Sequence, residues 1–166
     1  MKPRTEFIWV SALLTTVLMV LAFVVIPSFW GSQSWRMSSR LVLLWAPAMA
    51  VALWLAAWFT TAWHARSVRL NKKPWSPSGM SFRTVLLVVV LFPLALAVWL
   101  LVSSVFDQVF AEQPGDFRET LSWLPMMVVY GFIIAMPTGV IPVFFFQYFL
   151  SRRYLRRVKQ VAVEAP

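Results

Sequence analysis

The chain contains no cysteine and a single histidine, His64, among its 166 residues. Without a thiol it cannot carry disulfide exchange, thiol-linked redox chemistry or a cysteine-ligated iron–sulfur cluster. One histidine with no acidic residue near it in sequence makes neither a zinc site nor a haem site that needs two histidines of one chain. We therefore expect no metal and no cofactor.

Charge is absent from most of the chain, which has only 6 acidic and 15 basic residues. Four windows contain no Asp, Glu, Lys or Arg at all: 7–35, 41–65, 84–106 and 120–151. Each is longer than the roughly 20 apolar residues that a helix needs to cross a bilayer. A soluble helix keeps one wet face that carries charge about every turn. The distribution therefore excludes a soluble globular enzyme, and the apolar excess excludes a disordered chain.

The windows predict an all-α membrane protein with four transmembrane helices in a small bundle, because a backbone inside a bilayer must pair its polar groups internally. The first window is too long for the apolar region of a signal peptide and lacks a cleavage site, so we expect it to be retained. One domain would cover 1–166, with spans at about 7–29, 41–63, 83–106 and 122–150 and a basic cytoplasmic tail at 151–166.

Orientation follows from the basic residues that flank the spans. Twelve of the 15 lie at the N-terminus, in the connection at 64–82 with the adjoining Arg83, or in the tail, and three lie in the other two connections. This bias predicts that both termini are cytoplasmic. Eleven of the basic residues are arginine, which points to a bacterial chain encoded by a GC-rich genome. We therefore expect a multi-pass protein of a bacterial inner membrane.

Two of the spans carry small residues at every fourth position, which places them on one helix face. Such faces let helix backbones approach closely in a membrane. They predict either internal packing, for example between spans two and four, or contact with a partner protein or a second copy. The residues are Gly131, Ala135 and Gly139 in span four, and Ala48, Ala52 and Ala56 in span two.

Proline interrupts the fourth span beside its small-residue face, at Pro137 and Pro142. Each proline deletes a helix hydrogen bond and tends to bend the axis. We expect the fourth helix to be kinked there. The kink would be either a static bend that lets the bundle close or a helix break that frames a binding site.

The tail begins with two pairs of arginines at i, i+4 spacing, Arg152 with Arg156 and Arg153 with Arg157. A continued helix would place them on one broad basic face. They predict contact with anionic lipids of the cytoplasmic leaflet, with a topology anchor or an acidic partner as alternatives. No aromatic platform accompanies them, so we do not expect nucleic acid binding.

No ionisable side chain lies in the middle of a span. Ion-coupled transporters and intramembrane hydrolases need one there, which argues against both classes. Our leading hypothesis is a non-catalytic protein that acts through intramembrane helix contacts, as an accessory subunit of a membrane complex or a protein of the toxin-immunity type. The alternative is an oligomeric subunit of a lipid or amphiphile transporter or flippase. Many unrelated small proteins share this architecture, so the fold does not decide between them.

Overall fold

In the computed structural model, residues 3–29, 35–70, 74–110 and 117–164 are described, and almost all of them are α-helical with no strand among them. The four helices are α1 (Pro3–Phe29), α2 (Trp35–Arg69), α3 (Pro77–Phe110) and α4 (Phe117–Glu164). The prediction of an all-α chain is confirmed. Side chains are described within these ranges except at 15, 19–29, 35–44, 120, 131, 134–139, 141, 142 and 162–164.

Each helix contains one of the expected spans and extends beyond it. Over the described residues, two stretches are long and apolar enough to cross a membrane: Trp45–Arg69 in α2 and Pro77–Phe110 in α3. A shorter apolar stretch, Leu121–Tyr130, lies in α4. Charged residues such as Arg66 and Arg69 lie inside α2 because the helix continues past the apolar window into its basic flank.

Helix α3 begins at Pro77, six residues before the predicted start of the third span. The Ser76 side chain accounts for this start, because its Oγ accepts a hydrogen bond from the Gly79 backbone N–H at 3.1 Å. A serine at the cap and a proline at the first helical position are the preferred residues for a helix N-terminus. The pair Ser76-Pro77 is therefore the sequence signal for the start of α3.

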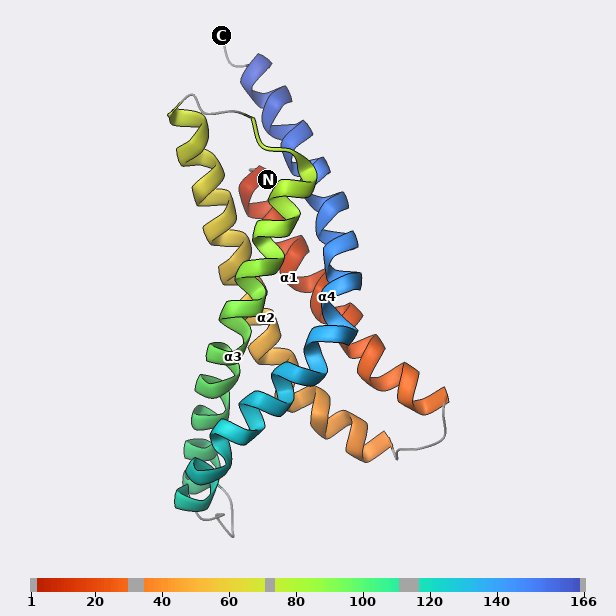
Figure 1. The fold of residues 1–166 in the computed structure, drawn as a ribbon, viewed down its shortest axis with the longest axis vertical. Coiled ribbons are helices and arrows are strands. Elements are labelled where there is room, and N and C mark those ends of the chain that lie inside the picture. The colour runs from red at the N-terminus through yellow and green to blue at the C-terminus, as the bar shows by residue number, and fades with distance from the viewer. Residues whose placement is uncertain (1–2, 30–34, 71–73, 111–116, 165–166) are drawn as a thin grey trace.

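The helices pack in chain order, α1 on α2, α2 on α3 and α3 on α4, and α4 returns to contact α1. Both chain ends and the α2–α3 connection lie at one end of the molecule, the upper end in Figure 1. We call this the terminal end. Toward the opposite end, the α1–α2 pair and the α3–α4 pair diverge, and α4 changes direction in its light-blue middle part (Figure 1).

The main core lies between α2, α3 and α4. The alanine face of α2 belongs to it, because Ala48, Ala52 and Ala56 are buried with residues of α3 and with Val143 of α4. The backbone of α2 nevertheless approaches α1 and α3 rather than α4 over the described residues. The α3 members of this core are Val85, Val88, Phe92, Leu96 and Leu100.

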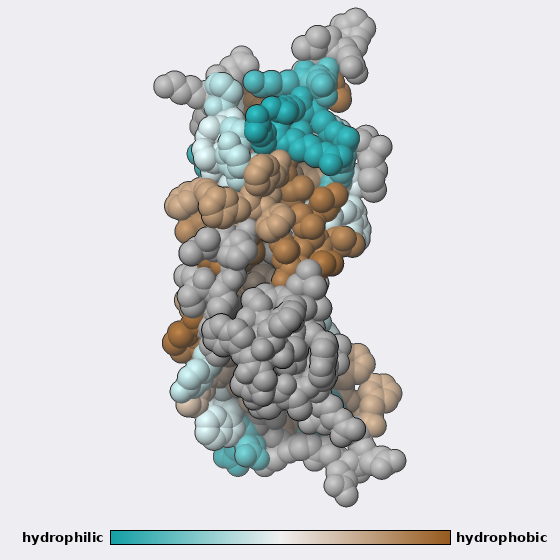
Figure 2. Space-filling model, turned by 90° about the vertical axis from the view of Figure 1, so that its right-hand side faces the viewer, coloured by the Kyte–Doolittle hydropathy of each residue, from teal (hydrophilic) through white to brown (hydrophobic). Residues whose placement is uncertain are grey.

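The outward face of α3 is also apolar. Its large exposed side chains recur every fourth residue and form a continuous stripe opposite the buried face. A soluble helix would place polar residues there. The stripe comprises Phe82, Leu86, Val90, Leu94, Val98, Val102 and Phe106. Figure 2 shows another side of the molecule, where hydrophilic residues gather at the terminal end and hydrophobic residues lie directly below them.

Candidate functional site

Close to the terminal end, all four helices bury polar side chains. We call this group the polar layer. Its members are almost inaccessible to solvent although they lie within long apolar helices. A buried hydroxyl or amide costs free energy unless it is hydrogen-bonded, so the pairing of each member matters. The polar layer consists of Ser11, Thr60, Thr61, His64, Ser81, Thr84, Gln147 and Ser151.

The threonines of the polar layer bond mainly to their own helices. Thr60 and Thr61 donate to the carbonyl oxygens of Ala56 and Ala57, at 2.7 and 2.9 Å. The Thr84 hydroxyl lies 3.0 Å from the Met80 carbonyl oxygen and 3.2 Å from Oγ1 of Thr60. Thr60 and Thr84 therefore form a polar contact between α2 and α3, and no water is needed to satisfy them.

Gln147 joins α4 to α1 by a hydrogen bond, but part of its hydrogen-bonding capacity is unused. Its Oε1 accepts a hydrogen bond from Ser11 at 3.4 Å, and the residue is 0% exposed. Its Nε2 and the Oγ of Ser151, one turn further along α4, have no hydrogen-bond partner. An unpaired buried amide nitrogen costs about 1–3 kcal/mol. These two atoms are the unsatisfied part of the polar layer.

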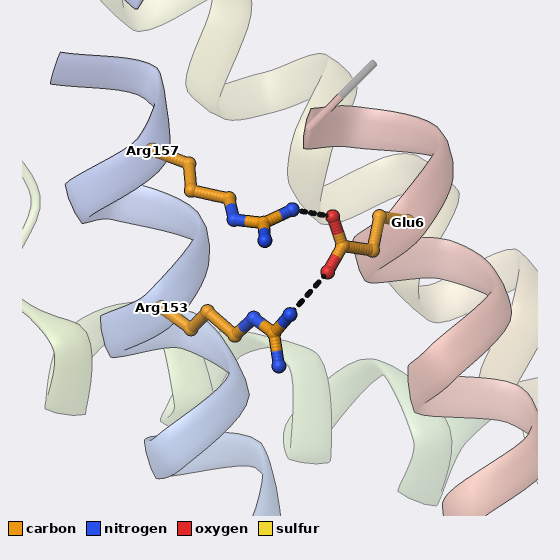
Figure 3. Close-up of polar contacts among 3 residues, drawn as sticks. All are labelled: Glu6, Arg153 and Arg157. Atoms are coloured by element: carbon orange, nitrogen blue, oxygen red, sulfur yellow. Dashed lines mark hydrogen bonds and ion pairs between the residues drawn. The ribbon is translucent and has the colours of Figure 1, made fainter. Parts of the chain in front are cut away.

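Glu6 and two arginines of the tail close α1 onto α4 (Figure 3). Arg153 lies 2.9 Å from one carboxylate oxygen of Glu6, and Arg157 donates to the other. The carboxylate is well covered, with 18% of the Glu6 side chain exposed. We call this group the Glu6 clamp. The i, i+4 spacing of the two arginines places both on the face that α4 turns toward α1.

The Glu6 clamp divides the predicted lipid-contact face. Arg153 and Arg157 are engaged within the molecule, whereas Arg152 and Arg156 are exposed. Glu6 was not among the predicted site residues, because nothing in the sequence shows that α1 and the end of α4 are neighbours.

Aromatic rings connect the Glu6 clamp to the α2–α3 corner. Phe7 packs on Tyr154 with ring centroids 5.1 Å apart, and Tyr154 packs on His64 at 5.6 Å. The His64 ring then meets Trp75 edge-on at 5.4 Å. His64 is only 6% exposed, so its ring belongs to the buried part of the molecule. Burial raises the pKa of Tyr154, partly offset by the charge of Arg4, so its hydroxyl is neutral at physiological pH.

A pocket of about 370 Å³ opens where α2 ends and α3 begins. Its lining combines two arginines, two tryptophans, a hydroxyl and one leucine. The Arg83 guanidinium lies 3.9 Å from the centroid of the Trp75 ring. The indole N–H of Trp75 donates to Ser67 Oγ at 3.1 Å. We call this the corner pocket, and it is lined by Trp63, Arg66, Ser67, Leu70, Trp75 and Arg83.

The corner pocket was not predicted from the sequence. Arg66 and Arg83 contributed only to the charge bias that predicts orientation, and nothing in the sequence brings them together with Trp63 and Trp75. The lateral approach of the α2 end to the α3 start brings the four side chains together.

The other predicted site residues have separate outcomes. Ala48, Ala52 and Ala56 are covered by the rest of the chain. The side chains of Gly131, Ala135, Gly139, Pro137 and Pro142 lie outside the described ones, although the backbone of α4 is helical throughout that stretch. Within the described part of the chain, no group of three or more His, Asp or Glu residues is placed to hold a metal ion.

Comparison with known proteins gives no family assignment. No protein-family model matches the chain, and neither a curated protein nor a solved structure resembles it significantly.

Proposed function

We propose that this chain is a non-catalytic, multi-pass protein of a bacterial inner membrane, with four spans and both termini in the cytoplasm. It acts through helix contacts, as an accessory subunit of a membrane complex or as an immunity-type protein. The charge bias and the apolar stripe of α3 support the membrane placement. The terminal end would then be the cytoplasmic end, with its basic residues at the lipid headgroups.

The observation that carries the functional part is the sparse packing of the first half of α4. Among its described side chains, Leu124 and Val128 are partly buried against the main core. The residues around them expose large side chains on several sides of the helix. These side chains are Leu121, Trp123, Met126, Met127, Val129, Tyr130 and Ile133.

This surface suits a transmembrane helix of another protein better than lipid alone. Methionine side chains adapt to irregular partner surfaces, and aromatic residues are enriched at interfaces. The same helix continues into Gly131, Ala135 and Gly139, whose spacing permits close helix approach. We propose that a partner helix lies along the first half of α4.

Site-specific photo-crosslinking in the native membrane tests this proposal. A photoreactive residue at Met127 or Ile133 should give an adduct with one membrane protein, and positions 131, 135 and 139 should extend the same contact. A photoreactive residue at Leu124 is the matched control, because that side chain packs inside the molecule. Adducts with lipid alone from 127 and 133, or intramolecular adducts alone from 131, 135 and 139, would contradict partner binding.

The unpaired atoms of Gln147 and Ser151 favour a second candidate, an oligomeric subunit of a lipid or amphiphile transporter or flippase. Unused hydrogen-bonding groups inside apolar helices are the kind of group that a polar substrate part would contact. Reconstitution of the pure protein with a fluorescent lipid separates the two functions. Lipid scrambling that is lost when Gln147 is substituted would support transport. If the reconstituted protein does not scramble lipid, this candidate function is wrong.

A further inference from the structure

The corner pocket contains positive charge that the described part of the chain does not neutralise. Arg66 and Arg83 are both exposed, and neither forms a salt bridge there. Both carboxylate oxygens of Glu6 are occupied by Arg153 and Arg157. A concave surface with two unpaired guanidinium groups attracts anions, and arginine suits phosphate because it donates two parallel hydrogen bonds.

The pocket wall is held in place before any ligand arrives. Trp75 is fixed on one side by its hydrogen bond to Ser67 and on another by the buried ring of His64. The Arg83 guanidinium lies over this indole, 3.9 Å from the ring centroid. Ser67 accepts the indole N–H and therefore keeps its own hydroxyl hydrogen for a ligand. A guanidinium already stacked loses less side-chain entropy when it binds.

We propose that the corner pocket binds the phosphate of an anionic phospholipid from the cytoplasmic leaflet. Arg66 and Arg83 would hold the phosphate oxygens, and Ser67 would donate a further hydrogen bond. A volume of about 370 Å³ accommodates a phosphate with its glycerol unit. The inference rests on the membrane placement proposed above, and it concerns a site separate from the first half of α4.

The surroundings of the pocket favour a lipid over a free phosphate compound. The polar groups share the lining with Trp63 and Leu70, whose side chains are more than half exposed. The exposed Phe82 follows at the start of the apolar stripe of α3. Phosphate groups bound at the arginines would therefore have an apolar surface beside them for acyl chains. A zwitterionic headgroup such as phosphocholine is disfavoured, because its ammonium group would lie close to two arginines.

Native mass spectrometry of the full-length protein in detergent micelles tests the site. Titration with dioleoylphosphatidylglycerol should give one tightly bound lipid per chain, bound about tenfold more tightly than dioleoylphosphatidylcholine. Arg66→Gln with Arg83→Gln should weaken the phosphatidylglycerol complex by at least about tenfold. The control Arg69→Gln with Lys159→Gln removes the same charge from exposed positions outside the pocket and should leave that complex unchanged.

Three results would overturn the proposal: equal binding of the two lipids, equal loss in both double variants, or no loss in the pocket variant. Glycerol 1-phosphate that binds as tightly as the lipid would show a free phosphate ligand instead. If the double variant does not fold, Arg66→Gln alone carries the test, with a loss of about threefold expected. The crosslink from Met127 should persist in these variants, so failure of this site is distinguishable from failure of the proposed function.

Discussion

At the residue scale, the Glu6 clamp is the clearest tertiary contact between the two ends of the chain. Glu6→Gln replaces a mostly covered carboxylate with a neutral amide and leaves Arg153 and Arg157 without their counter-charge. We expect a loss of about 1 kcal/mol in the free energy of unfolding, because both arginines are partly exposed and remain solvated.

Thermal unfolding in detergent measures this loss, and it should shrink as salt concentration rises. Arg152→Gln is the matched control, because Arg152 is exposed on the same turn of α4 and makes no such pair. Equal melting temperatures for wild type and Glu6→Gln would show that the clamp contributes nothing to stability.

Gln147 gives a second prediction at this scale. Most core substitutions lower the melting temperature, but Gln147→Leu should not. Gln147→Leu removes one long hydrogen bond to Ser11 and also removes the unpaired Nε2. We expect an unchanged or higher melting temperature, because the burial cost of the orphan amide disappears with it. Gln147→Glu should lower the melting temperature, since it places a carboxyl group at the same buried position. A marked loss of stability in Gln147→Leu would show that the amide has a partner in the folded protein.

At the element scale, the alanine face of α2 sets how closely the neighbouring helices approach. Ala52 is fully buried, so Ala52→Leu forces three extra carbon atoms into a filled contact. We expect a destabilisation of about 1–3 kcal/mol, measured by thermal or denaturant unfolding in detergent. Val51→Leu changes the adjacent exposed residue and should have little effect. Similar melting temperatures for both variants would mean that α2 is not tightly packed at Ala52.

The elements also show what the sequence could predict and what it could not. The apolar windows located all four helices because the absence of charge over a long stretch is a local property. Their ends were less accurate, since a helix such as α2 continues into its charged flank and α3 begins at a cap, Ser76, that hydropathy does not detect. The corner pocket and the Glu6 clamp were missed because each depends on which helices become neighbours.

At the scale of the whole molecule, the proposed orientation can be measured by labelling single introduced cysteines. No native cysteine has to be removed first, because the chain has none. Single cysteines at the exposed positions Gln108 and Glu119 should react in intact cells with a thiol reagent that cannot cross the inner membrane. Single cysteines at Ser78 and Lys159, at the terminal end, should react only after permeabilisation. The reverse pattern would invert the topology, and reaction at all four sites in intact cells would contradict membrane spanning.

The Glu6 clamp also has a consequence for the order of events during synthesis. Glu6 and Arg157 are separated by 151 positions, so the carboxylate is made well before its partners. At translation rates of roughly 5–20 residues per second, about 7–30 s pass between the synthesis of Glu6 and the synthesis of its arginine partners. Until the ribosome has made α4, α2 is the one helix that α1 contacts over the described residues. The ring of helix contacts therefore closes only after the ribosome has made α4.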